Sequence, residues 1–353
     1  MFIVIADDFS GAAEIAGIAH RHGARVELTT TPSLDHKADI LVIDADSRRQ
    51  SAAIAERIHQ ELAQRLANLP ERPAIFKKVD SVLRGHVAIE THALASGLDV
   101  SSIYLLPANP SRQRIISQGR YMVAGKLITE SMFARDPHFP AVHDNVRQIL
   151  QTAAPNTPVA EWEIPDTENH EAIRTAIGRA PDDALIVGGA DAFEEFLQKY
   201  RGRPPSVNPA LKPSAGGKAL IVHGSAMTPA ADQSALTERG VPQLTPTEFS
   251  LNEVNRCFRQ CPMVAVETGP HLPILIPTLL DITTNAPEVH LALTGGATAT
   301  AVLRHLGTTR FTVSMELAPG VVTLLPRGEN CGPITVKPGS YLWPATFFDL
   351  IFK

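Results

Sequence analysis

The chain has 353 residues, of which 44% are hydrophobic and 20% are charged, and its formal net charge is −5. A chain of this length can bury a sizeable core and form two domains, whereas the small negative charge argues against a general affinity for the phosphates of nucleic acid. No apolar run approaches the roughly 20 residues that a membrane span needs.

The N-terminus leads directly into an apolar segment, without a basic stretch, so we expect no secretory signal and a cytoplasmic protein. The three cysteines, Cys257, Cys261 and Cys331, are too sparse for a disulfide framework. Cys257 and Cys261 lie one turn apart if that segment is helical, but no further metal ligands are obvious nearby. We therefore expect reduced thiols and no metal site.

The first eleven residues, MFIVIADDFSG, join an apolar strand to two adjacent carboxylates, Asp7 and Asp8. A Ser10-Gly11 turn then opens an Ala-rich helical segment, and this order is typical of an α/β domain. Ligands of open parallel sheets bind beyond the carboxyl ends of the strands, so Asp7 and Asp8 lie where a polar ligand would be held. The alternative is a solvated turn with a helix-capping aspartate.

Apolar segments alternate with helical ones along the chain, which predicts largely parallel sheets covered by helices. The expected strands span residues 2–6, 39–45, 74–79, 102–108, 184–189, 219–224, 263–268 and 290–296. The expected helices include residues 12–23, 51–69, 191–200 and 297–307. The predicted fold class is therefore α/β.

Residues 201–217, RGRPPSVNPALKPSAGG, contain four prolines, end in glycines and offer little that could pack in a core. This composition is typical of a linker, and α/β patterning restarts directly after it. We therefore expect two domains, at residues 1–210 and 211–353. The alternative is a long surface loop within one domain.

Polar residues crowd into the segment KKVDSVLRGH, which ends the expected strand at 74–79. If that strand is continuous to its last residue, Lys78 and Asp80 share a face and Ser81 begins the turn. Arg84 then presents a planar fork suited to a carboxylate or a phosphate. A carboxylate-binding cation beside hydroxyl acceptors is what a polyhydroxy acid requires. The alternative is a solvated turn with internal salt bridges.

The segment ADSRRQS at residues 45–51 ends another expected strand in the same way. It places Ser47, Arg48 and Arg49 at a second carboxyl end and so adds positive charge to the same rim. An arginine that only caps or pairs locally is the alternative.

Three turns in the C-terminal half are rich in glycine and hydroxyl residues. The turn at residues 294–298 leads into a helix, whose backbone N–H groups and dipole favour a phosphate. These turns favour a nucleotide site, although no Walker A loop is present and glycines also follow strands for steric reasons. The candidates are Ser225, Thr294, Gly295, Gly296, Thr298, Lys337 and Gly339.

Taken together and in this order, the motifs resemble the four-carbon acid sugar kinases, a family long described as a domain of unknown function. The resemblance covers residues 1 to about 340. Its carriers are IADDFSGAAEIAG, SRRQSA, KKVDSVLRG, LPANPSRQRIISQGRYMVAGKLITESMFARDP, GSAMTPAADQ, LALTGGATATAVLRHLG and ELAPGV. The most specific are the ADDFSGA start, KKVDSVLRG and the FARDP element at residues 133–137.

The resemblance implies an N-terminal acid-sugar-binding domain, a C-terminal ATP-binding domain and an active site in the cleft between them. It implies phosphoryl transfer from ATP, with Mg²⁺ bound largely by the triphosphate, to a terminal hydroxyl of a threonate, an erythronate or an oxo-tetronate. The expected partners are a sugar acid and ATP, with no nucleic acid and no membrane, and we expect a homodimer.

By motif, Asp8 or else Asp80 is expected to orient or deprotonate the acceptor hydroxyl, and Arg84 with Lys78 to hold the substrate carboxylate. Further substrate-side residues are Asp7, Ser47, Arg48 and Ser81. The nucleotide-side residues implied by the resemblance are Ser225, Gly295, Gly296, Thr298 and Gly339, and the turn pattern adds Thr294 and Lys337.

Two motifs depart from the family pattern. The usual GGDT of the phosphate turn has Ala297 here, and the usual K-[ST]-G-x-F-G ending reads KPGSYL at residues 337–342. The missing carboxylate removes a candidate for magnesium coordination or base chemistry, which favours, as one alternative, a catalytically weakened or non-catalytic ligand-binding relative. Another alternative is a sugar-acid isomerase or dehydratase, which would use the same carboxylates without a nucleotide.

Overall fold

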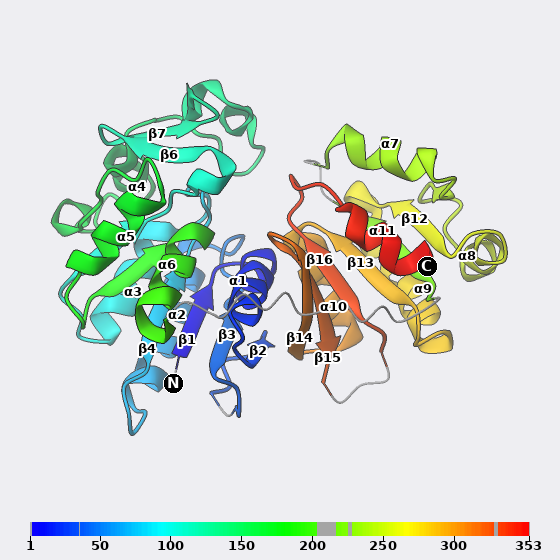
Figure 1. Ribbon diagram of the computed structural model, residues 1–353, viewed down its shortest axis with the longest axis horizontal. Coiled ribbons are helices and arrows are strands. Elements are labelled where there is room, and N and C mark those ends of the chain that lie inside the picture. The colour runs from blue at the N-terminus through cyan, green and yellow to red at the C-terminus, as the bar shows by residue number, and fades with distance from the viewer. Residues whose placement is uncertain (1, 35, 203–216, 225–227, 328–330, 353) are drawn as a thin grey trace. The chain divides into compact units, whose positions relative to one another are not determined.

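The computed structural model describes residues 2–34, 36–202, 217–224, 228–327 and 331–352 (Figure 1). The chain divides into two compact units, residues 1–8 with 39–205 and residues 9–38 with 206–353. Each unit combines helices with a mostly parallel sheet, so the predicted α/β class is confirmed. Most of the predicted linker at 201–217 lies outside the described residues, and so does Ser225.

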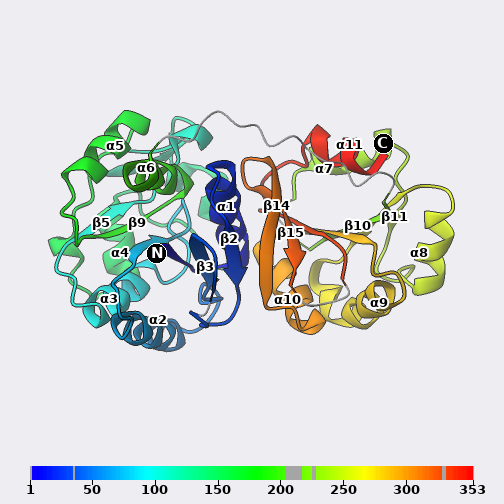
Figure 2. The same cartoon turned by 60° about the horizontal axis from the view of Figure 1, so that its bottom comes forward.

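The first unit contains a sheet of five parallel strands in the order β3-β1-β4-β9-β5. Helices α2 and α3 lie on one side of it, and α5 and α6 on the other (Figure 2). Because both faces are covered, the strands are apolar along most of their length. The bounds are β1 Phe2–Ala6, β3 Ile40–Asp44, β4 Ala74–Lys78, β5 Ile103–Leu106, β9 Leu185–Gly188, α2 Ala52–Ala67, α3 Val87–Gly97, α5 His170–Arg179 and α6 Ala190–Arg201.

The register of this sheet sets where its polar loops begin. Ala6 of β1 is opposite Asp44 of β3 and Lys78 of β4, so the three strands end at one level. The loops that follow them therefore start side by side at the carboxyl edge of the sheet.

A small antiparallel sheet, which the sequence patterns did not predict, completes the first unit. It consists of β6, β7 and β8, and Tyr121 of β7 is fully buried. The elements of this region are η1 Pro110–Arg112, β6 Arg114–Ser117, β7 Arg120–Val123, β8 Lys126–Leu127, η2 Ile128–Glu130, η3 Met132–Arg135, α4 Val146–Ala153 and η4 Val159–Glu161.

The sheet of the second unit has parallel strands in the order β11-β12-β10-β13-β16, continued by antiparallel β15, β14 and β2. Strands β10, β12 and β13 were expected, whereas β14 and β15 were not. The bounds are β2 Val26–Thr29, β10 Ala219–His223, β11 Gln243–Leu244, β12 Met263–Glu267, β13 His290–Thr294, β14 Arg310–Ala318, β15 Val321–Pro326 and β16 Ile334–Lys337.

The helices of the second unit include α1, from the N-terminal part of the chain. Residues 9–38, which the expected limits 1–210 assign to the first domain, pack here, because β2 pairs with β14 and Phe9 of α1 meets Phe311 edge to face at 5.5 Å. The helices are α1 Phe9–Arg21, α7 Ala230–Glu238, α8 Leu251–Phe258, η5 Gly269–His271, α9 Leu272–Asn285, α10 Gly296–Leu306 and α11 Ala345–Phe352.

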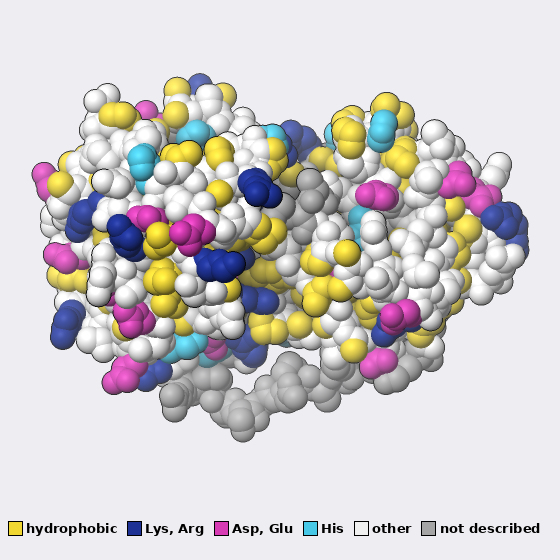
Figure 3. Space-filling view, turned by 90° about the horizontal axis from the view of Figure 1, so that it is seen from above, with side chains coloured by type: hydrophobic (Ala, Val, Ile, Leu, Met, Phe, Trp, Pro, Cys, Tyr) yellow, Lys and Arg dark blue, Asp and Glu magenta, His cyan; other side chains and the backbone are white. Residues whose placement is uncertain are grey.

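The three cysteines are free thiols, as expected, and two of them, Cys257 and Cys261, are buried. In the described part of the chain, no helix has both the length and the apolar character needed to cross a membrane. On the face drawn in Figure 3, acidic and basic side chains are interspersed with neutral ones.

Candidate functional site

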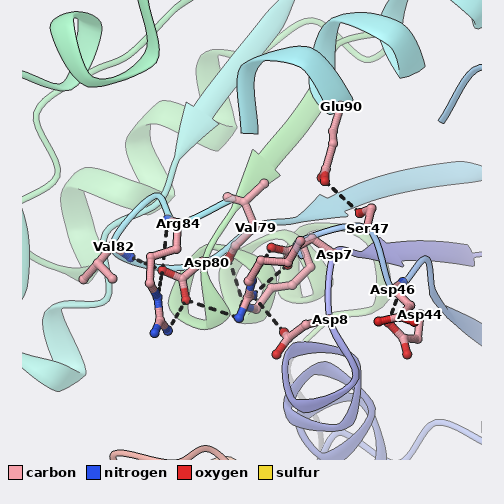
Figure 4. Close-up of polar contacts among 12 residues, drawn as sticks. Asp7, Asp8, Asp44, Asp46, Ser47, Val79, Asp80, Val82, Arg84 and Glu90 are labelled. Carbon is pink, nitrogen blue, oxygen red and sulfur yellow. Dashed lines mark hydrogen bonds and ion pairs between the residues drawn. The ribbon is translucent and has the colours of Figure 1, made fainter. Parts of the chain in front are cut away.

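The loops that follow β1, β3 and β4 bring most of the predicted substrate-side residues together in the first unit (Figure 4). Asp7 and Asp8 follow β1, Arg48 belongs to the loop after β3, and Asp80 and Arg84 belong to the loop after β4. These residues come together because β1, β3 and β4 end at the same level, so that the three loops leave the same edge of the sheet.

Arg48 lies at the centre of the cluster. Its Nε donates to Asp7 Oδ2 at 2.6 Å and its Nη2 to Asp7 Oδ1 at 2.9 Å, which is a two-point contact. Its Nη2 also lies 2.8 Å from Asp8 Oδ1, and its Nη1 lies 3.7 Å from Asp80 Oδ1. One guanidinium thus offsets the repulsion between two adjacent carboxylates and reaches a third.

A second arginine, Arg84, pairs with Asp80. Its Nη2 and Nε donate to the two oxygens of Asp80 at 2.7 and 3.0 Å, and the backbone N–H groups of Val82 and Arg84 also donate to Asp80 Oδ2. Nη1 of Arg84 lies 3.4 Å from Asp136 Oδ2. The internal salt bridges of the alternative interpretation are therefore present in this loop.

The charges of the site shift one another's pKa values. Burial raises the pKa of Asp7, with Arg48 opposing that shift. Burial also disfavours ionised Asp80, but Arg84 and Arg48 outweigh it and hold the pKa of Asp80 well below its usual range. The charge of Asp80 in turn raises the pKa of Arg84. Asp80 therefore stays ionised and hydrogen-bonded, which makes it a poor proton acceptor at neutral pH.

Asp8 is the most exposed of the three carboxylates. Its side chain is 14% exposed, compared with 2% for Asp7 and 7% for Asp80. A substrate hydroxyl can therefore reach Asp8 more easily than either neighbour.

Ser47 and Lys78 are buried rather than presented to a ligand. Ser47 is fully buried, and its hydroxyl donates to Glu90 Oε1 of α3 at 2.7 Å. Lys78 is 3% exposed, and its Nζ donates to the carbonyl of Val79 at 3.0 Å. Their contact with a substrate stays a prediction.

Ser81 connects the site to the small antiparallel sheet. Its hydroxyl accepts from Arg114 Nη1 at 2.5 Å, and its carbonyl accepts from the hydroxyl of buried Tyr121. The guanidinium carbons of Arg114 and Arg84 lie 5.1 and 5.9 Å from the ring centroid of Phe133. The small sheet and the η3 helix thus hold the β4 loop from outside the main sheet.

A cavity of about 160 Å³ borders the loop after β4, with Arg84 in its wall. Its other walls are mostly apolar and include Leu83, Ile128, Phe133 and Val142. An apolar lining does not suit a polyhydroxy acid, so the carboxylate cluster itself is the better candidate site.

The glycine turn of the second unit follows β13 and opens α10. Gly295 has a φ of +96°, which favours glycine, and its N–H donates to the carbonyl of Lys337 at 2.9 Å. A Cβ on Gly224, after β10, would collide with Thr298 Oγ1. The backbone of Gly224 therefore lies directly against the side chain of Thr298 in the first turn of α10.

Two of the other predicted nucleotide-side residues, Thr294 and Lys337, are buried. Thr294 is buried, and its hydroxyl lies 3.4 Å from His223 Nδ1. Lys337 is fully buried, and its Nζ pairs with Asp232 at 2.9 Å and donates to the carbonyl of Tyr341 at 2.6 Å. Gly339 lies in the turn after β16. Phosphate contacts of these residues stay predictions.

Sequence reasoning missed several members of the first-unit cluster. No sequence pattern pointed to Glu90, because a lone glutamate in a helical segment is normally exposed to solvent. Arg114, Tyr121 and Asp136 lie inside the long segment that carried the family resemblance, so that segment was the signal for them.

The sequence profile of a family described as a sugar-binding N-terminal domain matches residues 2–195. D-threonate kinase of Salmonella typhimurium is 30% identical over 198 residues, which are 55% of this chain and 46% of that protein. 3-oxo-tetronate kinase of Brucella melitensis is 24% identical over 421 aligned positions, which cover 98% of this chain and 94% of that protein. The first match thus spans about half of its relative, and the second spans nearly all of it.

Two solved structures resemble the whole chain. A Haemophilus influenzae protein of the DUF1537 family matches with a TM-score of 0.74 at 20% identity, over 99% of both chains. A Salmonella typhimurium LT2 protein matches with a TM-score of 0.76 at 19% identity, over 99% of this chain and 97% of that one. At this identity the likeness confirms the fold.

Asp80→Asn is predicted to lower the free energy of unfolding by about 3 kcal/mol at pH 7, because two cations lose their buried partner. A carboxyl with a depressed pKa contributes its stability above its unfolded value near pH 4 and loses it as the pH falls. The difference between wild type and variant should therefore be constant from pH 8 to 5 and shrink below about pH 4.

Urea unfolding at pH 7, 5 and 3.5 measures this difference. Asp144→Asn is the matched control, because its partner Arg120 is 56% exposed and 3.7 Å away, and it should change stability by less than about 1 kcal/mol. A difference for Asp80→Asn that does not change between pH 7 and 3.5 would contradict the assignment.

Proposed function

The chain belongs to the family with a sugar-binding N-terminal domain, and on this premise we propose that it is an ATP-dependent kinase of a four-carbon sugar acid. The acceptor is a terminal hydroxyl of a threonate, an erythronate or an oxo-tetronate. The relatives named as kinases of D-threonate and 3-oxo-tetronate support this reaction. The observation that carries it is the cluster in which Arg48 and Arg84 hold three carboxylates at the edge of the first sheet.

Arg84 is the residue to which we assign the substrate carboxylate. Its side chain is 27% exposed, compared with 14% for Arg48. Asp80 fixes the guanidinium through Nε and Nη2, so its orientation is set before a ligand arrives. A preorganised arginine binds a carboxylate with little loss of side-chain freedom.

Asp8 is the residue to which we assign the acceptor hydroxyl. Phosphoryl transfer needs mainly alignment of the hydroxyl with the γ-phosphate and neutralisation of charge. Arg48 fixes one oxygen of Asp8, and the side chain is more accessible than Asp7 or Asp80. Asp8 therefore orients the hydroxyl and accepts its proton while the hydroxyl oxygen bonds to the γ-phosphorus and the bond between that phosphorus and ADP breaks.

The glycine turn at residues 294–298 is our candidate for the phosphates of ATP. The first turn of α10 offers backbone N–H groups and the positive end of the helix dipole. Gly295, whose φ is +96°, and Gly296 place no side chain over the backbone of this turn. The described residues contain no cluster of three or more His, Cys, Asp or Glu able to hold a metal. We assign magnesium to the ATP complex, in which the triphosphate would supply its oxygen ligands and the metal would neutralise phosphate charge.

A catalytically weakened relative that only binds the acid or the nucleotide is the second candidate function. Ala297 motivates it, since it is exposed in the first turn of α10 where the family usually has an aspartate. Turnover separates the two candidates.

ADP release from MgATP, measured with a panel of threonate, erythronate and oxo-tetronate stereoisomers, tests the proposed function. We expect release with at least one acid, together with a phosphorylated product found by mass spectrometry. Binding of an acid without release would favour the second candidate, and release without any acid would mean hydrolysis only.

The two assigned roles predict opposite kinetic defects. Asp8→Asn should lower kcat by about a hundred-fold or more with a small change in KM for the acid. Arg84→Ala should raise KM for the acid by about ten- to a hundred-fold and leave the affinity for ATP nearly unchanged.

Arg120→Ala is the control for Arg84→Ala, because it removes an arginine of the same unit that is 56% exposed and remote in sequence from the β4 loop. Near-normal turnover in Asp8→Asn would contradict the hydroxyl role assigned to Asp8. Equal weakening of the acid and ATP in Arg84→Ala would contradict the assignment of the carboxylate.

A further inference from the structure

A buried ion pair lies behind the loop that carries Arg48. Glu90 of α3 is 1% exposed, and its Oε2 lies 2.8 Å from Nζ of fully buried Lys77 on β4. Its other oxygen, Oε1, accepts from the hydroxyl of Ser47 at 2.7 Å (Figure 4). Burial works against ionised Glu90, but Lys77 outweighs it and lowers the pKa of Glu90 to about 2.

His59 of α2 borders the pair without adding charge to it. Burial and the nearby Lys77 lower the pKa of His59 to about 4, so the ring is neutral at pH 7. Its Nδ1 donates to the carbonyl of Ala55 at 2.8 Å, which leaves Nε2 unprotonated at 3.6 Å from Glu90 Oε2.

The loop that Ser47 belongs to needs support from outside itself. Asp46 has a φ of +45°, a left-handed conformation that costs energy in residues other than glycine. The backbone N–H groups of Ser47 and Arg48 donate to the carbonyl of Asp7 at 3.0 and 3.1 Å. The bond from Ser47 to Glu90 is a further anchor, made by a side chain to a charged acceptor, which is strong and directional.

From this arrangement we propose that Glu90 is a positioning residue for phosphoryl transfer, acting through Ser47 on the loop from which Arg48 reaches Asp7 and Asp8. Its effect on turnover rests on the proposed function, whereas its effect on Arg48 does not. A buried ion pair adds little net stability over apolar side chains of the same size. Holding Ser47, and with it the direction of Arg48, is the distinctive contribution of this pair.

Two variants of the pair separate positioning from charge. Glu90→Asp keeps the charge opposite Lys77 but withdraws the carboxylate from Ser47 by one methylene. Glu90→Gln combined with Lys77→Met removes both charges but leaves an amide oxygen for Ser47. The new amide nitrogen then takes the place of Oε2, where unprotonated Nε2 of His59 can accept its N–H.

If Glu90 acts by holding Ser47, the double variant should remain active, because it keeps the hydrogen bond to Ser47. Glu90→Asp should lower kcat about ten- to a hundred-fold, with the affinity for ATP unchanged. Glu90→Gln/Lys77→Met should keep kcat within about threefold of wild type. Wild-type kcat in Glu90→Asp, or a double variant as slow as Glu90→Asp, would overturn the proposal.

Ser47→Ala removes the same hydrogen bond from its other end and leaves the ion pair intact. It should reproduce the kcat loss of Glu90→Asp. Ser117→Ala is the matched control, since the Ser117 hydroxyl donates to the exposed carboxylate of Glu168 at 2.5 Å, and its kcat should equal that of wild type.

Arginine side-chain NMR tests the position of Arg48 without any turnover. The Nε–H of Arg48 donates to Asp7, so its ¹H–¹⁵N signal, identified by its loss in Arg48→Lys, should exchange slowly with solvent. Exchange should be about tenfold faster in Ser47→Ala and in Glu90→Asp, but not in the double variant. Unchanged exchange in Ser47→Ala would overturn the positioning role, whereas a wild type that phosphorylates no acid would overturn only the proposed function.

Discussion

The contact between Arg48 and the adjacent pair Asp7 and Asp8 is the interaction on which the first-unit site depends. Two neighbouring carboxylates at the end of a buried strand repel each other, and burial adds a desolvation cost. A guanidinium that bonds Asp7 at two points and Asp8 at a third offsets both effects. Because Arg48 also lies near Asp80, one side chain connects the loops of three strands.

The parallel sheet makes this contact geometrically simple. Strands β1, β3 and β4 end at the same level, so the three loops that follow them lie next to one another. Residues far away in the sequence then hold these loops. Glu90 anchors the loop of Arg48 through Ser47, and Tyr121 anchors the loop of Asp80 through the carbonyl of Ser81. The charged groups of the cluster also differ in exposure. Asp8 is more accessible than Asp7, and Arg84 is more accessible than Arg48.

Much of the fold could be predicted because parallel strands are continuous apolar runs, and all eight expected strands are present. Strand β14 is partly exposed and carries mixed residues, so no apolar run marked it. Strand β15, VVTLLP, is mostly buried and apolar, and the sequence analysis missed it although it carried a strand signal. The packing of residues 9–38 depends on contacts with β14, which no sequence pattern revealed.

The strand-end motifs pointed to Asp8, Arg48, Asp80 and Arg84 as candidate site residues. They did not predict the ion pairs among these residues, because a short polar segment does not reveal which charge faces which. Glu90 was missed because a helical glutamate is normally exposed, and only the structure shows that this one is buried and bonded to Ser47.

The turnover of Arg48→Lys tests the central claim most directly. Lysine keeps the positive charge but cannot make two parallel bonds to Asp7 while reaching Asp8. With the acid that the wild type phosphorylates best, kcat should fall by about a hundred-fold, because Asp8 loses its fixed orientation. A kcat within about threefold of wild type would contradict the account, since charge alone would then be sufficient at this position.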